Sequence, residues 1–290
     1  MAQAGVIAKR DAVSPGAASV TRIRVVTVIA ILAAWEGLAL LGRLEFLYGD
    51  VIPSSLWIAL AIGEELISAD FYHHLSITFA EHIVGFIVGS IIALAVGIAM
   101  GVNPLLRGAL EPYLNAIGST PKIIFLPILF LMFGTGIESK MAKGALSAFF
   151  PVVFTTALGM LLINPVLIRV GKSFNLTSRQ MIAKIYIPAM VNPVITGLRL
   201  GMAITVIGVL VAELKFADGG LGYQLGIYYE QFRIASMYAI ILIIFALAAT
   251  ANVAMTRLQD RANRHMAPTT TKGGKGSASA SGGLGVAATN

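Results

Sequence analysis

Long apolar runs without a charged residue dominate the chain. None of Asp, Glu, Lys or Arg occurs at positions 83–106, 144–168 or 234–256. Each run exceeds the ~20 residues with which a helix crosses ~30 Å of hydrocarbon. Since a spanning segment in lipid must satisfy its own backbone groups, these runs are expected to be helices. The pattern predicts an all-α, polytopic membrane protein.

Six spans follow from the whole pattern of apolar and charged positions. They are expected within residues 25–42, 75–101, 105–134, 140–162, 188–214 and 235–258. Segment 43–74 has one Arg and five acidic residues, whereas 164–187 has four basic residues and no acid. Lys and Arg gather in cytoplasmic loops, so both termini are predicted to be cytoplasmic. A cleaved signal peptide is the alternative for the first span. Glu36 inside the run and the lack of a small-x-small cleavage site argue against it.

The segments between and beyond the spans divide the chain further. We expect a cytoplasmic segment at 1–24, a first transmembrane helix and extracytoplasmic loop at 25–74, and a core domain at 75–258. Residues 259–290 are expected to be a disordered cytoplasmic tail, because their end is rich in Gly, Ser, Ala and Thr. The third span contains Pro112, Pro121 and Pro127, which predict a kinked or broken helix.

Composition supports the membrane assignment and narrows the chemistry. The residues AVILMFWYC make up 57% of the chain and DEKR 12%, so little polar surface is left to cover a soluble core. The net charge of +7 is explained by cytoplasmic loops rather than by nucleic-acid binding. With no Cys, and with four His that lack metal-binding spacing, no metal site is expected.

Small residues recur every four positions in two spans and predict close helix packing. The second span carries Gly85, Gly89, Ala93, Gly97 and Gly101, and the fifth carries Gly197, Gly201, Thr205 and Gly208. Spacing of four keeps such residues on one helix face, where they let another backbone approach. The partner helix could lie in this chain or in a second copy.

Charged residues inside spans are costly and are candidates for function. Counted from the cytoplasmic ends of their helices, Glu36 and Arg199 both lie roughly 16–18 Å deep. One hypothesis is a charge pair between them that locks two helices, and another is that Arg199 contacts substrate. Lys122, beside Pro121, is a further candidate for a cation that faces the interior.

The loop at about 164–187 has strong local signals for two short helices. Asn164 suits an N-cap and Pro165 the first turn, so a first helix should run to about Phe174. Asn175 is expected at positive φ, which would break the helix. Thr177 and Gln180 predict a capping box that starts a second helix, ending before Pro188. The two helices would form a compact knob.

Several stretches between Leu75 and Leu258 carry a resemblance to a known family. They are Thr120–Pro127 with Phe133–Gly136, Ala148–Pro151, Ile185–Ala189, Gly197–Gly201 and Gly219–Tyr223. In order and spacing they resemble the inner-membrane permease subunit of bacterial ABC importers, of the nitrate/sulfonate/taurine type. In one respect the chain departs from the family, because the E-A-A of the signature loop and its later Gly are here Arg169, Val170, Gly171 and Asn175.

The resemblance implies a transport subunit without catalytic residues. It would form the translocation pathway for a small, anionic solute in the bacterial inner membrane. Its implied partners are a second permease copy, a cytoplasmic ATPase dimer that binds ATP and Mg, a periplasmic solute-binding protein and membrane lipid. The signature loop would dock the ATPase through Arg169, Gly171, Lys172, Asn175, Thr177, Gln180, Ile185 and Pro188. A secondary transporter or channel is the alternative class, although no internal repeat is found.

Overall fold

The computed structural model describes residues 17–44 and 51–266, and within these ranges every regular element is a helix. The long helices are α1 (Ala17–Arg43), α3 (Ala69–Val102), α6 (Ile137–Leu161), α9 (Ile187–Phe216) and α11 (Ile234–Met266). The shorter ones are α2 (Ser55–Ile67), α4 (Pro104–Ser119), η1 (Lys122–Phe125), α5 (Leu126–Phe133), α7 (Pro165–Ser173), α8 (Ser178–Met181), η2 (Ile182–Tyr186) and α10 (Leu221–Glu230).

The predicted membrane helices are present. Five described helical segments are long and apolar enough to cross a membrane: Val20–Arg43, Ala69–Val102, Ile137–Leu161, Ser178–Lys215 and Ile234–Arg261. The helices Pro104–Ser119 and Lys122–Phe133 together make a sixth span if the two are counted as one segment. The angle of the bend between them is 96°. The break falls at Pro121, as the prolines of the third span predicted. Proline lacks the N–H that would continue the helix.

The ends of the chain differ in part from the prediction. Helix α11 continues beyond Leu258 to Met266, so residues 259–266 are helical and not part of a disordered tail. This stretch contains no Gly or Pro before Pro268, and its Gln, Arg, Ala and Met residues favour helix. Helix α1 begins inside the predicted N-terminal segment. Positions 1–16 and 267–290 lie outside the described residues.

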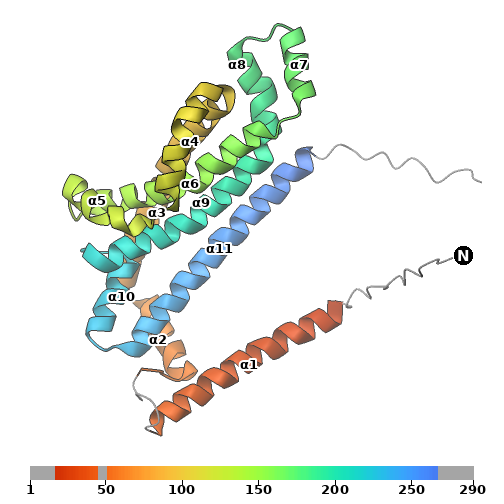
Figure 1. Ribbon diagram of the computed structural model, residues 1–290. Coiled ribbons are helices and arrows are strands. Elements are labelled where there is room, and N and C mark those ends of the chain that lie inside the picture. The colour runs from red at the N-terminus through yellow and green to blue at the C-terminus, as the bar shows by residue number, and fades with distance from the viewer. Residues whose placement is uncertain (1–16, 45–50, 267–290) are drawn as a thin grey trace, which may run out of the picture.

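Helix α6 is the centre of the fold, because α3 packs along one side of it and α9 along another (Figure 1). The small residues of both spans face α6. A Cβ added to Gly85 of α3 would lie 2.7 Å from the carbonyl oxygen of Met141 on α6. A Cβ added to Gly201 of α9 would lie 2.9 Å from a side-chain carbon of Val152 on α6. The partner of both stripes is therefore a helix of the same chain.

The two ends of the bundle differ in construction (Figure 1). Helices α7 and α8 project together at one end, while α2 and α10 lie at the opposite end. Helix α1 stands apart from the bundle over most of its length and approaches it near α2.

Candidate functional site

The segment between α6 and α9 folds as its local sequence predicted. The Asn164 side chain accepts a hydrogen bond from the N–H of Val166 at 2.9 Å, and Pro165 occupies the first turn of α7. The helix ends at Ser173, and Asn175 follows with φ of 50°. Thr177 and Gln180 then form a complete capping box at the start of α8. The predicted helix break at Asn175 and the predicted caps are confirmed.

The predicted end of the second helix before Pro188 is wrong. The chain remains helical from Ser178 through the π-helical segment η2 into α9. The Ile187 N–H donates to the Ile182 carbonyl, which gives the wide turn directly before Pro188. A π-turn accommodates an extra residue within a helix, and a proline is tolerated in a first helical turn. The second arm of the knob is therefore continuous with span five.

The knob presents apolar and basic side chains on its surface. Gly171 is buried against Met181 and Ile185, which brings α7 close to the second arm. Val166 and Val170 of α7 are about half exposed, and Phe174, directly after the helix, is 77% exposed, so these residues form an exposed apolar stripe with a spacing of four. The four basic residues of the knob, Arg169, Lys172, Arg179 and Lys184, are all exposed, and no acidic residue occurs between Glu138 and Glu213. Such a surface suits docking of a partner better than contact with water alone.

The predicted pair of Glu36 and Arg199 does not form. Glu36 accepts hydrogen bonds from the backbone N–H of Ser55, at 2.7 Å, and from its hydroxyl, so it caps the start of α2. Arg199 instead donates from Nε to Asn252 Oδ1 of α11 at 3.0 Å. Equal depth along two helices does not make their side chains neighbours, because α1 approaches the bundle near α2, at the C-terminal end of α1 (Figure 1).

Lys122 lies at the break in the third span. Its ammonium donates to the carbonyl of Gly118 at 2.6 Å and lies 4.8 Å from the centre of the Phe150 ring. A cation at the C-terminal end of α4 satisfies carbonyls that the bend leaves without helical partners. Lys122 therefore stabilises the bend and is only partly buried.

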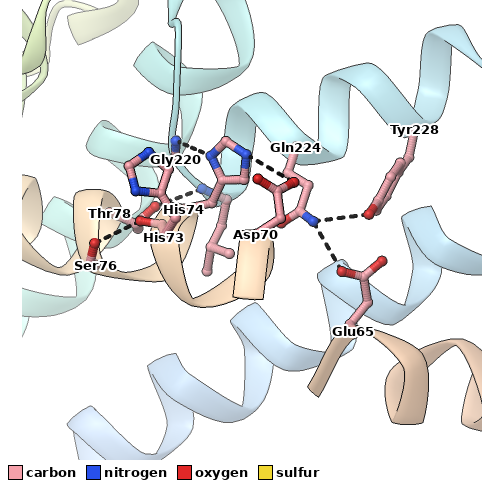
Figure 2. Close-up of polar contacts among 10 residues, drawn as sticks. Glu65, Asp70, His73, His74, Ser76, Thr78, Gly220, Gln224 and Tyr228 are labelled. Carbon is pink, nitrogen blue, oxygen red and sulfur yellow. Dashed lines mark hydrogen bonds and ion pairs between the residues drawn. The ribbon is translucent and has the colours of Figure 1, made fainter. Parts of the chain in front are cut away.

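A polar network that the sequence did not reveal surrounds the first turn of α10. The N–H of Gly220 donates to His74 Nδ1 at 3.1 Å (Figure 2), and the N–H of Leu221 donates to Thr78 Oγ1 at 2.7 Å. The N–H of Gly222 donates to Glu213 Oε2 at 2.7 Å. Three side chains from α3 and α9 thus satisfy donors that the start of a helix leaves unpaired. Glycine is required at Gly220, since its φ is 104°.

The network continues toward α2. Gln224 of α10 donates to Glu65 at 3.0 Å and to the Tyr228 hydroxyl at 2.9 Å (Figure 2). Burial raises the pKa of the Tyr228 phenol, and the neighbouring Glu65 carboxylate raises it further. Tyr228 therefore stays a neutral hydrogen-bonding group at physiological pH. These contacts fix α10 against both α2 and α3.

More charge is buried deeper in the bundle than the sequence suggested. Glu81, Lys140 and Lys143 are almost completely buried, and Lys143 donates to Ser147 at 3.1 Å. Both carboxyl oxygens of Glu81 lack a donor among the described residues, although Glu213 and Lys140 lie close by. The rule that singled out Arg199, a charge inside a span, would have found these residues as well. No group of three or more possible metal ligands occurs in the described part of the chain.

Comparison with known proteins identifies the class. Residues 85–267 match the model of the family described as binding-protein-dependent transport system inner membrane components, and the chain belongs to this family. It is the multi-pass permease subunit of an ATP-driven ABC importer of the inner membrane. It is not an enzyme, since ATP hydrolysis takes place in a separate subunit. Membership of the family implies an ATPase and a solute-binding protein as partners.

Individual relatives cover most of the chain. It is 29% identical over 231 residues to a Bacillus subtilis permease named for aliphatic sulfonate transport, covering 80% of this chain and 82% of the relative. It is 28% identical to a taurine transport system permease protein of Escherichia coli, covering 68% of this chain and 73% of the relative. Among solved structures, a chain of the inward-facing MetNI methionine ABC transporter shares the fold. Its TM-score is 0.60 at 20% identity, covering 68% of this chain and 99% of that chain.

Proposed function

We propose that this permease imports a small anion and that the knob formed by α7, α8 and η2 couples it to the ATPase. The observation that carries the coupling proposal is the construction of the knob. Its two arms are capped locally, held together at Gly171, and one arm continues without a break into α9. A force applied to the knob would therefore reach the membrane through a continuous helix.

The proposed coupling surface consists of the apolar stripe on α7 and the exposed basic residues of the knob. The exposed residues Arg169, Lys172, Asn175, Thr177 and Gln180 belong to this part of the knob. Gly171 and Ile185 lie between its two arms, and Pro188 is exposed in the first turn of α9. An ATPase subunit with an apolar cleft would cover Phe174. ATP and Mg would be bound by that subunit and by no group of this chain.

The substrate proposal rests on the relatives and on charge. Two relatives are named for sulfonate and taurine transport, and another, from Synechococcus elongatus, is a nitrate import permease protein. Each named solute carries an anionic oxygen-bearing group. Arg199 and Lys122 provide cationic groups in or beside spans, which favours an anion.

We propose further that two copies of this chain form the pathway and that both termini are cytoplasmic. Helix α1 leaves most of its apolar surface uncovered within one copy, which is consistent with contacts to lipid or to a second copy. The orientation can be tested because the chain has no Cys. In intact cells, an impermeant thiol reagent should label Glu64→Cys and should leave Lys172→Cys unlabelled. The opposite pattern would reverse the orientation.

The coupling proposal is tested at Asn175, whose positive φ a β-branched residue disfavours. In the complete transporter with its ATPase and binding protein, Asn175→Val should abolish ATP-driven uptake while membrane insertion remains normal. Asn175→Gly is the matched control, because glycine adopts positive φ readily and should retain uptake. Normal uptake by Asn175→Val would contradict the proposal.

A further inference from the structure

Two acidic side chains lie together, completely buried, where α3, α9 and α10 meet. The exposed fraction is 0% for Glu81 on α3 and 1% for Glu213 on α9, and the two carboxyl groups lie within hydrogen-bonding reach of each other. Like charges at such a distance repel each other strongly where water is excluded. The pair is therefore stable only if it carries fewer than two negative charges.

The hydrogen-bond donors around the pair are distributed unequally. Glu213 accepts a hydrogen bond from the Thr78 hydroxyl at 2.6 Å on one oxygen and from the Gly222 N–H at 2.7 Å on the other. Neither carboxyl oxygen of Glu81 has a donor among the described residues. Donors favour the ionised form of a carboxyl group, whereas a buried carboxylate without donors is so costly that the group takes up a proton instead. The contacts therefore favour a negative charge on Glu213 and a neutral acid at Glu81.

One positive charge lies close to the pair. Lys140 of α6 acts on both acids, but the ion pairs found among the described residues do not include it, and its ammonium donates to the Thr135 carbonyl. The other buried cation of this helix, Lys143, donates to Ser147 at 3.1 Å. One nearby cation balances one carboxylate, so a second negative charge on Glu81 would have no counter-ion.

We propose that Glu81 is a proton-binding site: at neutral pH it is a neutral carboxylic acid, and its hydroxyl donates to the Glu213 carboxylate. A carboxylate can accept several hydrogen bonds, so Glu213 can accept this one in addition to those from Thr78 and Gly222. The proton is then the ligand that joins α3 to α9. Because Glu213 also holds the first turn of α10 through Gly222, the same proton keeps α10 in place at the end of the bundle opposite the knob (Figure 1).

Other titratable groups surround Glu81. On α3 itself, His82 follows directly and has no partner at either ring nitrogen among the described residues, and His74 accepts a backbone N–H at the start of α10. On α10, Tyr223 lies against His74 with ring centres 5.7 Å apart, and no acidic residue occurs in the first turn. The cation of α6 and the carboxylate of α9 complete the set. A comparison that changes position 81 alone leaves all of these groups in place.

A retained proton makes stability depend on pH with a definite sign. A Glu of the unfolded chain releases its proton above about pH 4.3, whereas folded Glu81 holds its proton at neutral pH. The folded protein therefore binds more protons than the unfolded chain, so a contribution to stability that is present at low pH is lost as the pH rises. Loss of the proton would place two negative charges beneath the start of α10 and loosen its attachment.

Infrared difference spectroscopy on the full-length permease in lipid tests the charge state directly. The C=O stretch of a protonated carboxyl group is well separated from the bands of a carboxylate. At neutral pH, Glu81→Gln should remove one protonated carboxyl band. Glu230→Gln, at the exposed end of α10, is the matched control and should remove none.

The pH dependence of unfolding by added dodecyl sulfate tests the number of protons. Between about pH 6 and 8, the unfolding equilibrium constant of the unmodified protein should rise about tenfold per pH unit relative to that of Glu81→Gln, because the folded chain holds one extra proton. The Gln side chain is neutral at every pH and its amide can still donate to Glu213. This variant should therefore fold and lack the dependence.

Three results would overturn the proposal. One is the absence of a protonated carboxyl band from the unmodified protein at neutral pH, a result that needs no variant to fold. Another is the same pH dependence of unfolding in the unmodified protein and in Glu81→Gln. The third is a higher thermal stability of the unmodified protein, but not of Glu81→Gln, in sodium chloride than in choline chloride, which would mean that a metal cation occupies the site. None of these measurements needs ATP-driven uptake, so a failure of the coupling or substrate proposals would leave their outcomes unchanged.

Discussion

The two ends of helix α9 are stabilised in different ways. At its N-terminal end, the knob uses caps between residues at most a few positions apart, such as Thr177 and Gln180. At its C-terminal end, the α10 network joins Thr78 to Glu213, which are 135 positions apart in the sequence. The caps of the knob join residues close in sequence, so they can form without contacts to the rest of the protein. The network around α10 can form only when α3, α9 and α10 are packed together.

This difference has a functional consequence. The chain connects the knob to the bundle through the continuous helix into α9 and a short segment after α6, and Ile168 and Tyr186 of the knob pack against a small apolar cluster at that end of the bundle. The α10 network cannot move without exposing buried polar groups, each of which would then lack a partner. We therefore expect changes in the network to reduce stability and changes in the knob to affect coupling.

The largest effect is expected at the centre of the network. Glu213→Ala would remove the acceptor of the Thr78 hydroxyl and of the Gly222 N–H, and would leave Glu81 as the remaining carboxyl group close to Lys140. Removing one partner from a buried charged network costs about 3–5 kcal/mol. Thermal unfolding of the detergent-solubilised protein should show a strong loss of stability. Glu230→Ala, at the exposed end of α10, is the control and should unfold like the unmodified protein.

A smaller but clear effect is expected in the packing of α3 on α6. A Cβ at Gly89 would press against the carbonyl group of Ala145, and a backbone atom cannot move aside as a flexible side chain can. Gly89→Ala should destabilise the bundle by about 1–3 kcal/mol. Gly108→Ala is the control, since nothing lies within 4 Å of its added Cβ. Equal unfolding temperatures for the two variants would show that α3 does not pack on α6 through this stripe.

The smallest effect on stability is expected in the knob. Thr177→Ala would remove one cap bond, which is worth about 1 kcal/mol and acts only on α8. Hydrogen exchange should speed up at the N–H groups of the first turn of α8, while the unfolding temperature of the bundle stays unchanged. Ser178→Ala leaves the capping box intact and serves as control. If Thr177→Ala lowered the unfolding temperature as much as Gly89→Ala, the knob would be part of the bundle's cooperative unit.

Much of the fold was predictable because its signals are local. Apolar runs of sufficient length specify spanning helices in lipid, and prolines in the third span specify a break. Asn164, Asn175 and Thr177 specify the knob, since each acts on backbone groups within a few residues. The prediction went wrong at Pro188, where the proline was taken as a helix end. The helix continues past Pro188 because a π-helical turn precedes it, and no local sequence signal predicted that turn.

The sequence by itself determined the membrane class, the spans, the local caps and the presence of small-residue faces. Only the tertiary structure decided that both small-residue faces meet α6, that Glu36 caps α2, and that Arg199 turns to Asn252. The physical reason is the difference between distance along a helix and direction around it. Covalent spacing fixes the depth of a side chain and its nearest backbone donors. Which helix lies opposite depends on how all the faces pack together.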